Sequence, residues 1–287
     1  MAIEMKLLDN PEAFPVSGRI ACQGIKGAYS YFAAQKMFPQ GKEIFFKTFD
    51  AVFEAVKSGM CDYGVVPIEN NSYGSVKAVY GLLEREHVYI IRSERLLICH
   101  QLMARPGTEM KDLTAVYSHE QALGQCSGYI KGLSDNVRVI PSLNTAVAAR
   151  YVAESKEAGE AAIASPECAA LYGLVPLNKH VQDSDNNYTR FVCLSREPLI
   201  YPGANRISLI LSIAHKPGSL YGILGKFADL GINMLKLESS PIVGRDFEFN
   251  FYIDIEAQAA NEKVRKMLEE IQVSCPEFIF LGNYTET

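Results

Sequence analysis

Short apolar segments alternate with segments of helical periodicity from Arg19 onward, and this alternation constrains the fold more than any other feature of the chain. The apolar segments are RIACQG, YGVVPI, LTAVYS, VRVIP and EAAIAS. Helical patterns are formed by Phe49, Val52, Phe53 and Val56 before Gly59, and by Ala122, Cys126, Tyr129 and Ile130 after Ser118. Strands that alternate with helices predict a parallel sheet covered by helices. We therefore predict an α/β fold for this part of the chain.

Polar residues follow several of the predicted strands. YGVVPI leads into ENNSYGS, LTAVYS into HEQ, and VRVIP into SLNT. In an open parallel sheet such turns lie at the carboxyl ends of the strands, where the N-termini of the following helices favour anions. The sequence therefore indicates a pocket for an anion, although Ser118, Asn144 and Ser165 are equally compatible with simple helix caps.

A different pattern begins after REPLIYPGANR, whose proline and glycine residues indicate a linker. Strands are predicted in RISLILSI, INMLKLES, DFEFNFYIDIE and EFIFLGNY, and helical stripes in residues 220–227 and 264–271. The order βαββαβ is typical of a small ferredoxin-like module. The alternation in DFEFNFYIDIE places Phe247, Phe249, Phe251 and Ile253 on one face, which we interpret as the core of that module.

Composition limits the classes of function. The net charge of −5 argues against nucleic acid as the main partner. The chain shows neither a signal-like apolar segment at its start nor 18 consecutive apolar residues, so we expect a cytoplasmic protein without a membrane span. The seven cysteines are scattered singly, which fits a reducing compartment and predicts no structural metal site.

The segment DSDNNYTRFVCLS places Thr189 and Arg190 between a polar turn and a predicted strand. Alone, this pair is compatible with an ordinary strand start and a solvated arginine. Together with other segments, however, it resembles the prephenate dehydratase family and the related arogenate dehydratases. The segments that carry the resemblance are QGIKGAYS (23–30), VPIENNSYGSV (66–76), YSHEQALGQC (117–126), AAIAS (161–165) followed by LYGL, and NNYTRF (186–191). The C-terminal part resembles an ACT regulatory domain through KPGSL (216–220), GIN (231–233) and ESSP (238–241).

The resemblance implies a two-lobed, periplasmic-binding-protein-like (type II) α/β catalytic region over residues 18–197 and a ferredoxin-like ACT domain over residues 203–284. The chain would cross to the second lobe near residue 95 and return near residue 178. The active site would lie in the cleft between the lobes, and DSDNNYTRF would lie where the lobes meet. We also expect a chain ended near Glu197 to retain activity, if it folds, and to lose its regulation.

The activity that the resemblance implies is the conversion of prephenate to phenylpyruvate, CO2 and water in L-phenylalanine biosynthesis, by a decarboxylating carbon–oxygen lyase. Aromatisation of the ring drives this reaction, so we expect no metal and no other cofactor. The enzyme must hold two carboxylates, orient the ring and help hydroxide to depart.

The catalytic residues implied by the resemblance are Thr189, Arg190, Ser118 and His119. We expect Thr189 to donate a hydrogen bond to the leaving hydroxyl, because a threonine hydroxyl is a poor general acid. Arg190 offers a bidentate fork for a carboxylate, or it braces Glu69 or an aspartate. His119 is either a group that helps with protons or substrate, or an exposed residue at the start of a helix.

The expected substrate-binding residues are Asn70, Ser72, Gly74, Gln125, Glu69 and Phe191. Glu69 would repel a dianionic substrate if it were ionised, so we interpret it chiefly as a member of an ion pair. Asn71 separates the VPIEN motif from Ser72, where the family usually has serine directly, and this leaves the role of Ser72 open.

The ACT resemblance implies L-phenylalanine as effector, bound where two modules of a homodimer or homotetramer meet. The expected effector-binding residues are Gly218, Ser219, Leu220, Asn233, Glu238 and Ser239. Ser240 stands where the family usually has arginine, so weak binding or a different effector is also compatible with the sequence.

Two alternative functions stay open. The substrate is arogenate if the cleft accepts an amino group in place of the keto group of prephenate. A sensor that binds an aromatic amino acid without catalysis would use the same fold, but it would not need the Thr189 hydroxyl.

Overall fold

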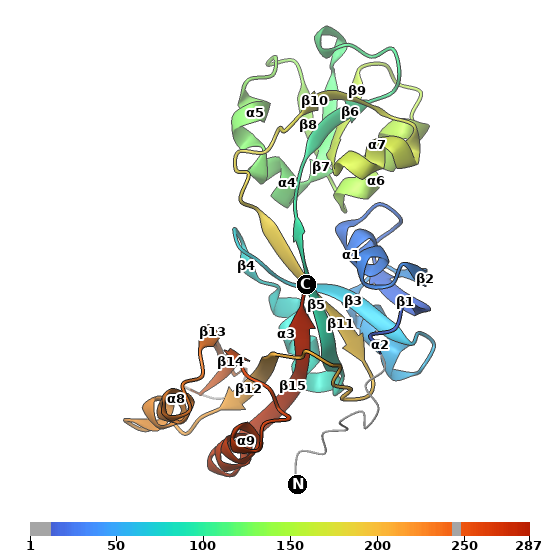
Figure 1. The fold of residues 1–287 in the computed structure, drawn as a ribbon. Helices are drawn as coiled ribbons and strands as arrows, with labels where there is room; N and C mark the ends of the chain where they lie inside the picture. Colours follow the sequence, from blue (N-terminus) through green and yellow to red (C-terminus); the bar gives the residue numbers. More distant parts are fainter. Residues whose placement is uncertain (1–12, 243–247) are drawn as a thin grey trace.

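The computed structural model describes residues 13–242 and 248–287. The chain forms two α/β lobes and a C-terminal module, with lobe 2 at the top of the view, lobe 1 in the middle and the module below (Figure 1). In the described part of the chain, no helix is long and apolar enough to cross a membrane.

Lobe 1 contains a sheet with the strand order β5-β11-β3-β1-β2. The strands are β1 (Ser17–Gln23), β2 (Gln40–Phe46), β3 (Tyr63–Asn70), β5 (Tyr89–Leu97) and β11 (Tyr188–Ser195), and the short β4 (Gly74–Ser75) pairs with β3. Helix α1 (Tyr29–Met37) covers one face, while α2 (Phe49–Lys57) and α3 (Lys77–Glu86) cover the other. Ile20 and Cys22 pack toward α1 and Ala21 packs toward α2, so β1 is apolar on both faces, as expected for a covered parallel strand.

Lobe 2 contains a second sheet, in the order β10-β6-β9-β7-β8. Its strands are β6 (Gln101–Ala104), β7 (Ala115–His119), β8 (Arg138–Ser142), β9 (Glu160–Ala164) and β10 (Val175–Lys179). Helices α6 (Thr145–Glu154) and α7 (Pro166–Tyr172) pack on one face, and α4 (Glu120–Gln125) and α5 (Ser127–Lys131) on the other, with a short 3-10 helix η1 at Met110–Asp112. The helix predicted through Ala122–Ile130 is interrupted at Cys126, whose φ of −115° and ψ of 19° end α4.

The chain crosses between the lobes twice, and the two crossings lie side by side. The first runs from Leu97 to Gln101 and the second from Lys179 to Tyr188. Backbone hydrogen bonds tie the crossings together: Ile98 N–H donates to Asn187 O at 2.7 Å, and Val181 N–H donates to His100 O at 3.2 Å. This two-crossing α/β arrangement confirms the predicted fold class.

The C-terminal module has the predicted order βαββαβ. Its elements are β12 (Arg206–Ser212), α8 (Ser219–Asp229), β13 (Met234–Pro241), β14 (Phe249–Glu256), α9 (Glu262–Ser274) and β15 (Glu277–Glu286), and the strand order is β13-β14-β12-β15. Phe247 lies outside the described residues. Ile207, Leu209 and Leu211 pack against α8 and α9, whereas Ile210 faces lobe 1.

The module is not a separate unit joined by a linker. Strand β15 pairs in parallel with β5, so one sheet continues from the module into lobe 1. A Cβ atom at Gly282 would lie 2.0 Å from the carbonyl oxygen of Ile90, so only glycine allows this close approach. Tyr252 of the module stacks on Tyr80 of α3 with ring centroids 4.3 Å apart. Lobe 1 and the module therefore share a hydrophobic core.

Candidate active site

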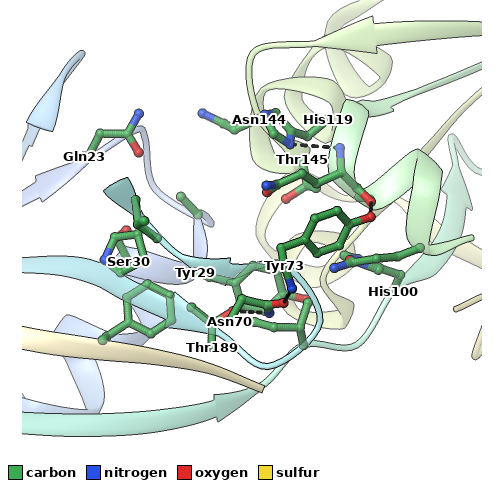
Figure 2. A pocket seen from close by; sticks show the side chains of 18 of the residues that line it. Gln23, Tyr29, Ser30, Asn70, Tyr73, His100, His119, Asn144, Thr145 and Thr189 are labelled. Atoms are coloured by element: carbon green, nitrogen blue, oxygen red, sulfur yellow. Dashed lines mark hydrogen bonds between the residues drawn. The ribbon is translucent and has the colours of Figure 1, made fainter. Parts of the chain in front are cut away.

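A cavity of about 450 Å³ lies in the cleft between the two lobes. Its lining comes from both lobes, and Figure 2 shows Asn70 and Thr189 on one side of it and His119, Asn144 and Thr145 on another. The residues that line it are Gln23, Ala28, Tyr29, Ser30, Phe49, Pro67, Asn70, Tyr73, Gly74, Ser75, Val76, Ile98, His100, His119, Gln121, Ala122, Gln125, Leu143, Asn144, Thr145, Thr189 and Phe191. No Asp, Glu, Lys or Arg occurs among these lining residues.

The pairing of β3 with β11 sorts four polar residues into two groups. Thr189 is the cross-strand partner of Asn70, and Arg190 is the partner of Glu69. Because neighbouring residues in a strand point to opposite faces, Thr189 and Asn70 share the cleft side of the sheet while Arg190 and Glu69 share the other side. In each of the adjacent pairs Glu69-Asn70 and Thr189-Arg190, the uncharged residue thus lines the cavity, and the charged residue lies on the opposite face of the sheet.

The Thr189 hydroxyl has a fixed acceptor role toward Asn70. The Asn70 Nδ2 group donates to Thr189 Oγ1 at 2.9 Å and also lies 2.8 Å from Asn187 Oδ1. The Asn70 Oδ1 atom accepts hydrogen bonds from the backbone N–H groups of Ser72 and Tyr73, at 2.9 and 3.0 Å. Since Asn70 is held at both ends of its amide, the proton of the Thr189 hydroxyl remains available for a group in the cavity.

Several helix N-termini face the cavity. Those of α1, α3 and α6 contribute Tyr29 and Ser30, Ser75 and Val76, and Asn144 and Thr145 to its lining, and the first residue of α2 and the N-cap of α4 also line it. Asn144 caps α6 by accepting a hydrogen bond from Val147 N–H at 2.8 Å. Unpaired N–H groups and the helix dipoles make such ends favourable for anions. The cavity can therefore bind carboxylates without a charged side chain.

His100 lies at the first crossing and was not predicted as a site residue. It lines the cavity, is almost fully buried, and its Nε2 atom lies 2.8 Å from Gln125 Oε1 across the cleft. Burial lowers the pKa of His100, although the hydrogen bond with Gln125 opposes this effect. The position of His100 in the sequence, close to the crossing predicted near residue 95, could have indicated that its side chain lies at the cleft.

Tyr73 connects the two lobes across the cavity and was also not predicted. Its side chain extends from the loop after β3, and its hydroxyl donates to the carbonyl oxygen of Gln121 in lobe 2 at 3.3 Å (Figure 2). Gly74, which follows Tyr73 and lines the cavity as expected, has a φ of 79° that favours glycine.

Of the other expected residues, His119, Gln125 and Phe191 line the cavity, but Ser118 and Ser72 do not. Ser118 is fully buried, and its hydroxyl donates to Ile163 O at 2.6 Å, so it links β7 to β9 instead of meeting a substrate. Ser72 is exposed on the loop beyond the cavity, because Asn71 shifts it one position along the turn. His119 caps α4, since its Nδ1 atom accepts from Gln121 N–H at 3.3 Å.

Arg190 and Glu69 also lie outside the cavity. Arg190 Nε lies 2.7 Å from Glu69 Oε1, and Arg190 Nη2 lies 2.7 Å from Asp254 Oδ2 in the C-terminal module. In this arrangement the guanidinium braces carboxylates of the protein and is not free to bind a substrate carboxylate. Burial raises the pKa of Glu69, but the charges of Arg190 and Lys236 outweigh it and hold this pKa below its ordinary value.

A smaller cavity of about 130 Å³ lies on the C-terminal module. It is lined by Ile213, Ala214, His215, Lys216, Ser219, Leu220, Phe249 and Phe251. Gly218 begins α8 with a φ of 83° directly beside it. Phe249 and Phe251, which we had interpreted as module core, belong to this lining, although Phe251 also packs against the core.

Four expected effector residues do not line the smaller cavity, and one of them, Gly218, directly precedes Ser219 of the lining. Asn233 packs beside β14, where its carbonyl oxygen accepts from Glu256 N–H at 2.9 Å. Glu238 contacts Ser75 of lobe 1, and Ser239 is exposed on β13. As for metals, no cluster of three or more His, Cys, Asp or Glu residues that could hold an ion occurs within residues 13–242 and 248–287.

Comparison with known proteins identifies the family. A sequence model of the family described as prephenate dehydratase matches residues 20–199. Arogenate dehydratase/prephenate dehydratase 2, chloroplastic, of Arabidopsis thaliana is 37% identical over 278 residues, which cover 93% of this chain and 72% of that protein. Arogenate dehydratase 2 of Petunia hybrida is 36% identical over 285 residues, covering 93% of this chain and 71% of that protein.

Solved structures agree with this result. Prephenate dehydratase from Arthrobacter aurescens in complex with L-Phe is similar with a TM-score of 0.84 and 28% identity, covering 93% of this chain and 89% of that one. GqqA, described as a novel type of quorum quenching acylase, has a TM-score of 0.83 and 30% identity, covering 94% and 98% of the two chains. The chain therefore belongs to the prephenate dehydratase family, whose enzymes are dehydratases that act on prephenate or arogenate.

Proposed function

We propose that the protein is a prephenate dehydratase that converts prephenate to phenylpyruvate, CO2 and water. The observation that carries this proposal is the cavity without Asp, Glu, Lys or Arg in its lining, to which several helix N-termini and a threonine hydroxyl with a proton to donate all contribute. Prephenate is a dianion with a ring hydroxyl. Its two carboxylates would meet helix ends, and its hydroxyl would meet Thr189.

The reaction requires two bonds to break. As the ring carboxylate leaves as CO2, the electrons of the broken C–C bond complete the aromatic ring, and the C–O bond breaks to release hydroxide, which takes a proton from solvent to become water. In the proposed mechanism Thr189 donates a hydrogen bond to the departing oxygen, where negative charge develops. Phe191 and Tyr29 supply ring surfaces in the lining against which the substrate ring would pack.

The lining of the same cavity favours prephenate over arogenate as the substrate. Arogenate carries an ammonium group where prephenate carries a keto group, and an ammonium group in a partly desolvated site is stabilised by a carboxylate. The lining includes no carboxylate, and Glu69 is already paired on the far side of β3. Arogenate dehydratase is nevertheless the alternative that the plant relatives favour, since their names include that activity.

The two substrates can be distinguished directly. The purified protein is incubated with prephenate and, separately, with arogenate, and phenylpyruvate and phenylalanine are followed over time. We expect kcat/KM for prephenate to exceed that for arogenate. A preference for arogenate would overturn the substrate assignment, and turnover of neither would support a sensor without catalytic function.

We extend the proposal to regulation by L-phenylalanine at the smaller cavity of the C-terminal module. Gly218 lets a carboxylate approach the N–H groups at the start of α8, and Phe249 and Phe251 supply aromatic surface. The Arthrobacter aurescens relative was solved in complex with L-Phe, which also supports this assignment. The cavity is small for an aromatic amino acid, so a second copy of the module would complete it.

A matched pair of variants tests this effector site. Gly218→Asp adds bulk and negative charge beside the cavity, whereas Gly107→Asp adds them to an exposed loop of lobe 2 with a similar φ of 88° and no neighbour within 4 Å. Calorimetry should show that phenylalanine binding is lost in the first variant and retained in the second. Undiminished binding to Gly218→Asp would place the effector elsewhere.

We also propose that the protein forms a homodimer or homotetramer and that it works in a reducing compartment such as the cytoplasm. Strand β13 lies at the edge of the sheet, and Leu235 and Leu237 on it are about 40% exposed, which supports pairing with a second copy. All seven cysteines are free thiols. Light scattering of the purified protein would give its oligomeric state.

A further inference from the structure

The Arg190 side chain connects the strand that carries Thr189 to three strands of the C-terminal module. Its Nη2 atom pairs with Asp254 Oδ2 of β14 at 2.7 Å, and its Nη1 group donates to Tyr284 Oη of β15 at 3.0 Å. Ser208 of β12 closes the network, since its Oγ lies 2.5 Å from Asp254 Oδ1 and 2.7 Å from Tyr284 Oη. All four residues are at least 97% buried. Water therefore screens these interactions very little.

Arg190 is also bonded covalently to Thr189 and paired across the sheet with Glu69. The backbones at Arg190 and Thr189 share a peptide bond, so a shift of one displaces the other. Glu69 in turn precedes Asn70, the residue that donates to the Thr189 hydroxyl. The position of the hydroxyl thus depends on Thr189 and Asn70. Thr189 adjoins Arg190, which Asp254 holds, and Asn70 adjoins Glu69, which pairs with the Arg190 guanidinium.

Strand β13 makes a second set of contacts with the same region. Lys236 Nζ lies 2.9 Å from Glu69 Oε2 and donates to Ser75 Oγ at 2.6 Å, while Glu238 accepts a hydrogen bond from the Ser75 hydroxyl. Ser75 lines the cleft cavity at the start of α3. The module therefore contacts the cavity wall at Ser75, and its two sets of contacts with lobe 1 meet at Glu69, which pairs with both Arg190 and Lys236.

We propose that Arg190 and Asp254 are positioning residues, and that their buried ion pair is the connection by which the C-terminal module sets the geometry of the Thr189 hydroxyl. This inference rests on the proposed dehydratase function. Displacement of a donor by about 1 Å can reduce a rate about 100-fold, so a small movement of the module at Asp254 is sufficient to alter turnover. Neither residue touches the substrate, and each acts only through Thr189 and Asn70.

The test is a double-mutant cycle between Asp254→Asn and Thr189→Val. Asp254→Asn keeps the shape of the side chain and removes its charge. We expect kcat to fall about 10-fold or more in the wild-type background with little change in KM, and to fall less than about twofold in the Thr189→Val background. Partial unfolding would reduce kcat equally in both backgrounds. Equal reductions would therefore overturn the proposal.

A milder variant and a control keep the test decisive if Asp254→Asn folds poorly. Tyr284→Phe removes the hydroxyl that accepts from Arg190 without changing a charge. Glu270→Gln neutralises a carboxylate of the same module that pairs on its exposed side with Lys226. We expect Tyr284→Phe to lower kcat about two- to fivefold only when Thr189 is present, and Glu270→Gln to leave kcat unchanged. A Tyr284→Phe effect that persists without Thr189 would contradict the proposal.

Hydrogen exchange gives a readout that does not depend on turnover. Peptides that span residues 186–195 should exchange faster in Asp254→Asn than in the wild type and in Glu270→Gln. If the wild type converts neither prephenate nor arogenate, the proposed function fails while this measurement still decides whether Asp254 positions β11. Unchanged exchange in a folded Asp254→Asn variant would overturn the positioning role.

Discussion

Asn70 determines the direction in which the Thr189 hydroxyl can donate. A hydroxyl that accepts from one fixed amide keeps one proton to donate, and the other end of the Asn70 amide is held by two backbone N–H groups. A threonine alone is a weak acid, but a hydroxyl oriented in advance can stabilise charge that develops on a leaving oxygen without reorganisation. The arrangement therefore favours hydrogen-bond donation over full proton transfer.

Removal of this hydroxyl should act on turnover more than on affinity. Thr189→Val keeps the shape of the side chain, and we expect kcat to fall about 100- to 1000-fold with KM little changed, because the lost hydrogen bond is used mainly in the transition state. Thr189→Ser retains the hydroxyl and serves as the control, with kcat close to that of the wild type. Steady-state kinetics of both variants decide the matter, and a folded Thr189→Val variant with normal kcat would refute the role.

Burial of His100 should make the stability of the protein depend on pH. Its pKa in the folded state is lowered below 6.5, mainly by burial, so the unfolded chain binds a proton more readily than the folded protein. The stabilising contribution is present above about pH 6.5 and is lost as pH falls through the folded-state pKa.

Urea unfolding at about pH 7 and about pH 5 measures this contribution. We expect the wild type to lose more unfolding free energy between these two pH values than His100→Gln, which cannot titrate. An identical loss in both proteins would show that other groups cause the pH dependence.

The residues at the site could be predicted from sequence only where a motif also fixes the face of a strand. Thr189, Asn70 and Phe191 reach the cavity as expected, whereas Ser118 and Arg190, which were also expected at the site, point away from it. Motif membership does not state which of two adjacent side chains faces the cleft. That choice depends on the register of β3 with β11, which neither segment specifies alone.

At the scale of elements, the cleft cavity presents helix N-termini, instead of charged side chains, to an anionic ligand. The polar turns after the predicted strands indicated an anion pocket, and the structure brings the ends of α1, α3 and α6 to one cavity. The sequence left capping and ligand binding as alternatives for Asn144. The structure shows that Asn144 caps α6 and lines the cavity, so the two roles are compatible.

Comparison of two asparagine caps by mutation can distinguish helix capping from ligand binding. Asn144 caps α6 at the cavity, and Asn261 caps α9 of the C-terminal module by accepting from Lys263 N–H at 3.0 Å. Replacement of either by alanine should cost about 1 kcal/mol of stability. Only Asn144→Ala should also raise KM, by about fivefold, because it disturbs the N–H groups that would meet a substrate carboxylate. Unchanged KM in Asn144→Ala would remove α6 from the proposed binding site.

At the scale of the whole molecule, the union of lobe 1 and the C-terminal module was not predictable from local patterns. One face of β12 packs against α8 and α9, and its other face carries Ser208, Ile210 and Ser212, two of which are polar. These residues are in fact buried, because lobe 1 covers them. The linker-like composition of residues 196–206 suggested independence, and it contains no information about the contact of β15 with β5.

This union changes what removal of the module should do. A chain that ends near Glu197 would lose β15 from the edge of the lobe 1 sheet and expose the face of lobe 1 that packs against Tyr252 and Tyr284. Arg190 would lose Asp254 but keep Glu69, and its guanidinium would become exposed to water, so the main cost is the newly exposed apolar surface, at about 25 cal/mol per Å². We therefore expect the truncated chain to be poorly folded or to show much reduced kcat, contrary to the simple expectation that it stays active. Thermal unfolding and kinetics of the truncated chain, beside the full chain, test this. A stable and fully active truncated chain would show that the module contributes neither to the core nor to the position of Thr189.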